Sequence, residues 1–121
     1  MKKILIVDDV RLMRNIIRNT LLEDDTYTIF EANNGQDALE SYKSNRPHLV
    51  TMDITMEKKN GVDAVRDILS FDRDAKIVMV SSLGQDKLMR ECIQAGVKDF
   101  IIKPFSKQRI KETVTKVLCS N

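Results

Sequence analysis

The sequence predicts an α/β domain in which helices cover both faces of a parallel sheet. Five short apolar runs alternate with five longer segments that have helical spacing. The connections between them are short, and strict alternation of this kind is built from right-handed crossovers between parallel strands. A chain of 121 residues has the length of one ordinary domain and can bury a single core. We therefore expect one domain over residues 1–121, without a separate output or DNA-binding module.

Each expected strand is a short run rich in residues that favour strands. In chain order the runs cover residues 4–7, 27–32, 48–52, 76–80 and 99–102. The first run, ILIV, is typical of a fully buried strand because it contains no polar position. His48 follows Pro47 and has no ligand next to it in the sequence, so we interpret it as a strand-start residue rather than a catalytic base or a phosphohistidine.

The segments between the strands have the apolar faces of amphipathic helices. The first expected helix places Met13, Ile16, Ile17, Thr20 and Leu21 on one face. The last does the same with Ile110, Val114, Val117 and Leu118. Gly96 stands directly before the last strand, where the fourth helix is expected to stop.

Charge and composition exclude several classes of protein. Lysine and arginine number 20 against 18 aspartate and glutamate residues, and the mixed signs form no basic block for nucleic acid or a membrane surface. The few apolar residues before Asp8 are too short for a signal peptide, and no run approaches a membrane span. Cys92 and Cys119 are isolated, which favours reduced thiols. We expect a cytoplasmic protein with no nucleic-acid or membrane partner.

Polar side chains follow four of the five expected strands. They are Asp8 and Asp9, Asp53, Ser81 and Ser82, and Lys103. In an open α/β sheet the ligand crevice lies beyond the carboxyl ends of the strands, so these groups should converge on one edge. Taken singly, each has a plainer explanation, such as a helix cap for an aspartate that follows a strand. Their joint placement is what predicts a site.

The types of residue in this set indicate phosphoryl chemistry with a metal. Three carboxylates without a histidine or thiolate form a hard oxygen site that suits Mg²⁺. The cation would also offset the repulsion between the adjacent Asp8 and Asp9. Beside the metal and the Lys103 ammonium, Asp53 could attack a phosphoryl group, because the charge that develops on its oxygens is neutralised from two sides. Ser81 could donate a hydrogen bond to that group.

These residues also resemble the receiver domain of two-component response regulators. The similarity covers the whole chain and is carried by VDD at residues 7–9, MDIT at 52–55, Ser81 and KPF at 103–105. It implies a flavodoxin-like fold, with a five-stranded parallel sheet of order 2-1-3-4-5 and helices on both faces. It further implies a phosphoacceptor that phosphorylates itself and loses the group slowly, rather than an enzyme that acts on other substrates.

The resemblance assigns a phosphoacceptor and a set of metal ligands. Asp53 would take the phosphoryl group from a phosphohistidine of a sensor histidine kinase and would also face the metal. Asp9 would bind Mg²⁺ directly and Asp8 largely through water. The backbone carbonyl of Thr55 would complete the protein ligands.

The resemblance also implies how the phosphoryl group is held and sensed. Lys103 would pair with Asp53 and then with the phosphoryl oxygens, across a cis bond to Pro104. Ser81 would move toward the phosphate. Phe100 would be the aromatic switch that turns inward behind Ser81.

Two stretches, residues 8–21 and 81–105, are similar to the chemotaxis, CheY-like branch of the family. This implies a chemotaxis kinase, the flagellar motor switch protein as target, a phosphatase that resets the signal, and a monomer, with a dimer through the fourth and fifth helices left open. The output face would be formed by the fourth helix, fifth strand and fifth helix and would include Lys87, Arg90, Phe100 and Lys107. The three charged residues could equally be solvated helix charges.

One position departs from the family's M-P-x-x-x-G pattern, because Glu57 follows Met56. Proline would stiffen this loop and glutamate does not, so Glu57 is either a tolerated exposed residue or an added carboxylate near the metal. Two rival classes fit poorly: an FMN-binding flavodoxin needs a first loop rich in glycine, serine and threonine, and an aspartyl-phosphate phosphatase needs aspartates one residue apart. A phosphorelay receiver outside chemotaxis and a receiver-like binding module that is never phosphorylated stay open.

Overall fold

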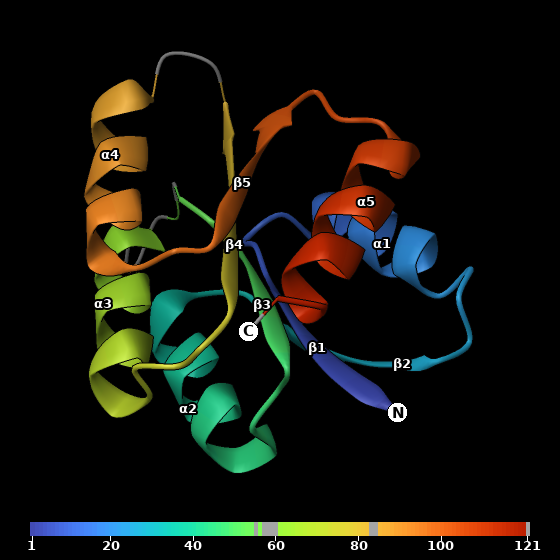
Figure 1. Cartoon of the computed structure of the whole chain (residues 1–121), viewed down its shortest axis with the longest axis horizontal. Coiled ribbons are helices and arrows are strands. Elements are labelled where there is room, and N and C mark those ends of the chain that lie inside the picture. Colours follow the sequence, from blue (N-terminus) through green and yellow to red (C-terminus); the bar gives the residue numbers. More distant parts are fainter. Residues whose placement is uncertain (55, 57–60, 83–84, 121) are drawn as a thin grey trace.

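The fold is built around a central sheet with helices on either side (Figure 1). The computed structural model describes residues 1–54, 56, 61–82 and 85–120. In chain order the elements are β1 (Lys2–Val7), α1 (Arg11–Leu21), β2 (Tyr27–Ala32), α2 (Gly35–Asn45), β3 (Leu49–Asp53), α3 (Gly61–Phe71), β4 (Ile77–Ser82), α4 (Asp86–Ala95), β5 (Asp99–Lys103) and α5 (Lys107–Leu118). The strands pair in parallel in the order β2-β1-β3-β4-β5. The α/β class and the flavodoxin-like strand order are therefore confirmed.

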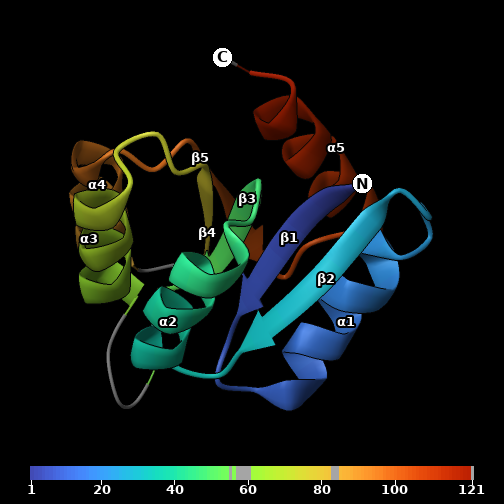
Figure 2. The same ribbon diagram turned by 90° about the horizontal axis from the view of Figure 1, so that it is seen from below.

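The sheet is covered on both faces, with α1 and α5 on one side and α2, α3 and α4 on the other (Figure 2). Along β1 the side chains alternate between two cores. Ile4 and Ile6 belong to the core under α1 and α5, whereas Leu5 and Val7 belong to the core under the other three helices. All four are at most 1% exposed. A strand that is buried on both sides needs an apolar residue at every position, which explains the run ILIV.

One predicted core position of α1 is wrong. Ile17 and Leu21 are buried and Met13 packs against the same core, but Ile16 is 41% exposed. Consecutive helical residues are turned by about 100°, so Ile16 lies at the edge of the stripe that Ile17 and Leu21 define. The predicted apolar face of the last helix is confirmed, because Ile110, Val114 and Val117 are buried and Leu118 packs against them.

Three strands, β3, β4 and β5, extend further toward their carboxyl ends than the sequence predicts. β3 includes Asp53, and Ser82 of β4 is paired with Lys103 of β5. Asp53, Ser81, Ser82 and Lys103 are therefore part of the sheet, whereas Asp8 and Asp9 lie in the loop directly after β1. At the other end β3 begins at Leu49, and His48 is joined to β1 by its backbone N–H, which donates to the Lys3 carbonyl at 2.8 Å.

Three further expectations concern the ends of elements and the cysteines. Gly96 ends α4 in the left-handed region with φ of 118°, as predicted for a helix stop. Cys92 is buried, Cys119 is exposed, and both are free thiols. Among the residues that the structure describes, no helix has the length and apolar character needed to cross a bilayer.

Gly61 allows α3 to start against the carboxyl end of β3. A Cβ atom at this residue would lie 2.3 Å from the Asp53 backbone oxygen and 2.5 Å from the Cα of Ile54. Because these are backbone atoms, Gly61→Ala forces the end of β3 to shift. We expect it to lower the free energy of unfolding by about 1–3 kcal/mol. Urea denaturation measures this change, with Ser70→Ala on the exposed side of α3 as the control; equal effects of the two substitutions would contradict the prediction.

Candidate functional site

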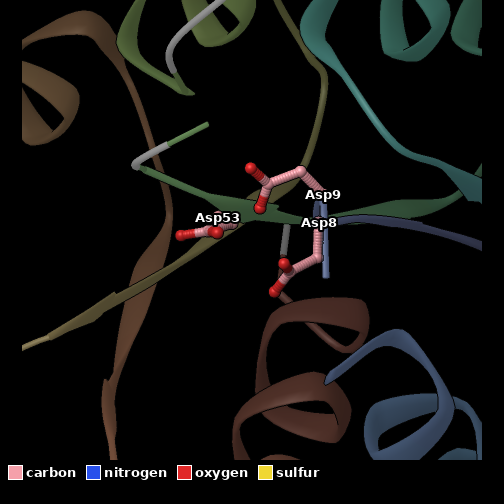
Figure 3. A group of neighbouring side chains, drawn as sticks. All are labelled: Asp8, Asp9 and Asp53. Atoms are coloured by element: carbon pink, nitrogen blue, oxygen red, sulfur yellow. The ribbon is translucent and has the colours of Figure 1, made fainter. Parts of the chain in front are cut away.

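Three aspartates meet where β1 and β3 end (Figure 3). Asp8 and Asp9 directly follow β1, and Asp53 is the last residue of β3. The two strands are neighbours, with Val7 opposite Met52, so the register of the sheet brings these residues together. Carboxylate oxygens of the three side chains lie within 4.8 Å of one another. The acidic cluster predicted from the strand ends therefore exists in space.

Burial makes this cluster electrostatically costly. Asp8 is 1% exposed and Asp53 is 4% exposed, whereas Asp9 is open to solvent. Burial raises the pKa of the Asp8 carboxyl above its usual value of 3.8, and the charge of Asp9 raises it as well; a hydrogen bond from the Val10 N–H and the charge of Lys103 act in the opposite direction. The Val10 N–H donates to Asp8 Oδ1 at 2.9 Å, but Oδ2 is buried without a hydrogen-bond partner among the described residues.

Lys103 brings a positive charge into the site from β5. Its ammonium nitrogen lies 3.8 Å from Asp8 Oδ2 and 3.8 Å from Asp53 Oδ1. The peptide bond between Lys103 and Pro104 is cis, as the family resemblance implied. Among the described residues of this cluster, one ammonium thus stands against three carboxylates, which leaves an excess of negative charge.

Ser81 and Phe100 come from the two strands at the far edge of the sheet. Ser81, in β4, has no exposed surface, and its hydroxyl donates to the Ser82 carbonyl at 3.0 Å or to Gln85 Oε1 at 3.1 Å. Phe100, in β5, is half-buried and packs against the core under α2, α3 and α4. Thr55, predicted to supply a carbonyl ligand, and Glu57 lie outside the described residues.

The sequence profile of the response regulator receiver domain matches residues 4–115. This chain belongs to that family. The chain is similar to chemotaxis protein CheY of Thermotoga maritima, with 44% identity over 96% of this chain and 97% of that protein. It is also similar to protein CcdB of Bacillus subtilis, with 46% identity over 98% of each protein. The crystal structure of the receiver domain of NtrX from Brucella abortus matches with a TM-score of 0.91 at 27% identity, over 98% of this chain and 99% of that one. The chain is a CheY-like receiver of two-component response regulators.

The structure divides the residues predicted for the output face of this receiver. Lys87 and Arg90 are exposed on α4. Lys107, at the start of α5, instead directs its ammonium to Glu23, which follows α1, at 2.9 Å. Lys111 also pairs with Glu23, and Lys111 first and Lys107 second lower the pKa of that carboxyl to about 2. In this structure Lys107 is therefore paired with a residue that follows α1, on the side of α5 that faces α1.

Sequence reasoning missed two residues that support the site of the receiver. Arg14 donates from Nη1 to the backbone oxygen of Asp8 at 2.8 Å and from Nε to Glu31 at 3.1 Å, which holds the loop after β1. Gln85 contacts Ser81 across the β4–α4 connection. Neither residue has a sequence signal. Glu31, one partner of Arg14, lies on β2 and is distant in sequence, and a glutamine at the start of a helix is ordinary.

The donor set of the receiver fits Mg²⁺. All three clustered side chains offer carboxylate oxygens, the ligands that this ion prefers. The buried Oδ2 of Asp8 has no hydrogen-bond partner in the described part of the chain, and a cation or its bound water could supply one. Asp8, Asp9 and Asp53 would hold the ion, whose charge would offset the repulsion within the cluster.

Asp8→Asn is expected to raise the stability of the metal-free receiver at neutral pH, because it removes a charge that burial and the neighbouring Asp9 disfavour. The pKa of Asp8 is higher in the folded protein than its usual value of 3.8, so at pH values below 3.8 its contribution to stability is fully present. This contribution is lost as pH rises through the raised pKa of the folded state. Asparagine keeps the shape and removes the charge. Denaturant unfolding in EDTA measures the change, with Asp25→Asn at an exposed position as the control.

The same variant should lose stabilisation by Mg²⁺. At about a hundred times its dissociation constant, a ligand that binds only the folded state stabilises it by about 2.7 kcal/mol. We expect the parent receiver and Asp25→Asn to gain this stability, and Asp8→Asn to gain much less at the same concentration. An equal gain in all three proteins would place the ion elsewhere.

Proposed function

We propose that this receiver takes a phosphoryl group from a phosphohistidine of a sensor histidine kinase onto Asp53, in a reaction that requires Mg²⁺. The observation that carries the proposal is the position of the Asp53 carboxylate. It lies within 4.8 Å of the oxygens of Asp8 and Asp9 and 3.8 Å from the Lys103 ammonium. A carboxylate placed between a site for a cation and a fixed ammonium is suited to attack on phosphorus.

In the proposed step an Asp53 oxygen forms a bond to phosphorus as the bond between phosphorus and the imidazole nitrogen breaks. The imidazole leaves with the electron pair of that bond. Lys103 neutralises charge on the phosphoryl oxygens, and Ser81 donates a hydrogen bond to one of them. Mg²⁺, when bound, supplies further positive charge at the same oxygens. Asp8 and Asp9 would hold the ion, and the Asp53 oxygen that does not face the ion would attack phosphorus.

The proposed output is a change in the surface formed by α4, β5 and α5. Its exposed charges Lys87 and Arg90 and the half-buried Phe100 lie on these elements, and Lys107 joins them only if its pairing with Glu23 opens. Because the relative from Thermotoga maritima is a chemotaxis CheY protein, the flagellar motor switch protein is the target that we propose. A chemotaxis kinase upstream, a resetting phosphatase, a monomeric state and a cytoplasmic location belong to the same proposal.

A phosphorylation assay tests the central step. The protein is incubated with acetyl phosphate in Mg²⁺ or in EDTA, and its intact mass is followed with time. We expect one added phosphoryl group in Mg²⁺ and little in EDTA. A mass that stays unchanged in Mg²⁺ would contradict the proposal and favour a binding module that is never phosphorylated.

A second candidate function keeps the chemistry and changes the target. The CcdB relative is 46% identical to this chain against 44% for the Thermotoga maritima protein, and its name does not mention chemotaxis. This favours keeping a phosphorelay receiver outside chemotaxis as an alternative. Binding of a flagellar switch-protein peptide to both forms separates the two: equal affinity with and without phosphate would remove the chemotaxis target and leave the phosphoacceptor role intact.

A further inference from the structure

Gln85 links the end of β4 to the start of α4. It precedes α4, and its backbone carbonyl accepts the Met89 N–H at 3.0 Å, which begins the helix. Its side chain turns back to the strand, where its amide oxygen accepts the Ser82 N–H at 2.8 Å and the Ser81 hydroxyl at 3.1 Å. The backbone N–H can only donate, so the oxygen of the amide must face the strand. One side chain thus contacts the last two residues of β4.

The Ser81 hydroxyl has acceptors within the protein in this arrangement. Ser81 has no exposed surface, and the acceptors recorded for its hydroxyl are Gln85 Oε1 and the Ser82 carbonyl. A hydroxyl carries a single proton, so it cannot donate to Gln85 and to a phosphoryl group on Asp53 at the same time. The Gln85 oxygen accepts hydrogen bonds from a hydroxyl and a backbone N–H at the end of β4. A phosphoryl oxygen needs donors of the same kind.

We propose that Gln85 is a positioning residue that holds Ser81 in the unphosphorylated receiver and competes with the phosphoryl group for the Ser81 hydroxyl and the Ser82 N–H. This inference rests on the proposed function of Asp53. Phosphoryl oxygens carry more negative charge than an amide oxygen and form stronger hydrogen bonds, so they take these donors. The Gln85 side chain then leaves the end of β4, and α4 loses the contact that ties its first turn to the strand. In this way phosphorylation of Asp53 in β3 changes how the start of α4 is held.

A double-mutant cycle tests the inference. Gln85→Met keeps the length of the side chain and removes its acceptor, and Ser81→Ala removes the donor. The rate of Asp53 phosphorylation by acetyl phosphate and Mg²⁺ is measured for the parent, both single variants and the double variant. With Ser81 present, Gln85→Met should raise the rate about fivefold, the factor that corresponds to one hydrogen bond of about 1 kcal/mol. With Ser81→Ala the Ser82 N–H is still released but no hydroxyl is, so the same change should raise the rate by a clearly smaller factor.

The control is Gln94→Met, the same substitution at an exposed position of α4, which should leave the rate unchanged. Equal effects of Gln85→Met in both backgrounds would overturn the inference, because a purely structural role in the connection does not depend on Ser81. Gln85→Ala repeats the cycle if the methionine variant does not fold, as judged by thermal unfolding. A parent protein that takes no phosphoryl group overturns the proposed function as well, whereas a phosphorylated parent with additive variants overturns the Gln85 inference alone.

Discussion

Asp53→Asn is expected to abolish phosphorylation by acetyl phosphate, with a rate loss on the order of 10⁴-fold or more, because it removes the proposed nucleophile. Asparagine has nearly the same shape as aspartate, so the ladder position at the end of β3 is kept. Its neutral amide oxygen is a poor nucleophile. Intact mass spectrometry of the variant and the parent, treated side by side, measures the loss.

Two observations would separate this result from unfolding or from a second acceptor. Asp25→Asn, at an exposed position outside the cluster, should be phosphorylated at the parent rate. The folded state of Asp53→Asn is checked by thermal unfolding, where removal of a buried like charge should leave the protein at least as stable as the parent in EDTA. Incorporation by Asp53→Asn at the parent rate would move the acceptor to another side chain.

Lys103→Met is expected to slow phosphorylation by about 10²–10³-fold, the range seen when one preorganised group that stabilises transition-state charge is removed. The Lys103 ammonium lies 3.8 Å from Asp53 Oδ1, where charge on the phosphoryl oxygens would develop in the proposed step. Methionine fills similar space without the charge. The rate with acetyl phosphate at saturating Mg²⁺ measures the effect.

The affinity of Lys103→Met for Mg²⁺ should rise, although its phosphorylation rate falls. Lys103 also lies 3.8 Å from Asp8 Oδ2, so its charge repels a cation bound by that carboxylate. Lys103→Met should therefore bind Mg²⁺ more tightly while reacting more slowly. Lys98→Met, at an exposed position, is the matched control and should change neither property. A variant that loses rate and metal affinity together would indicate a collapsed site rather than a missing charge.

The sequence was a good guide to the strands and to the acidic cluster. A strand buried on both faces must be apolar throughout, so ILIV was visible without any structure. Polar residues that follow parallel strands meet at one edge, so Asp8, Asp9 and Asp53 could be grouped before their distances were known. The strand order could not be predicted from periodicity, because periodicity shows that a strand exists but not which strand lies beside it. That order came from the resemblance to receivers.

Contacts between side chains from different elements were decided by the tertiary structure. The pairing of Lys107 with Glu23, and the support of Asp8 by Arg14, depend on how helices and strands are placed in space. Ile16 shows the same limit within one helix, because the width of the buried stripe depends on how closely α1 packs on the sheet.

The amino-acid sequence by itself determined that this protein has alternating strands and helices and carries three aspartates, a serine and a lysine at strand ends. Local periodicity and residue chemistry are sufficient for that much. Only the tertiary structure decided that the Lys103 ammonium stands between Asp8 and Asp53, and that Gln85 Oε1 lies 3.1 Å from the Ser81 hydroxyl. The physical reason is that hydrogen bonds and ion pairs act over a few ångströms, so they are set by the packing of elements and not by spacing along the chain.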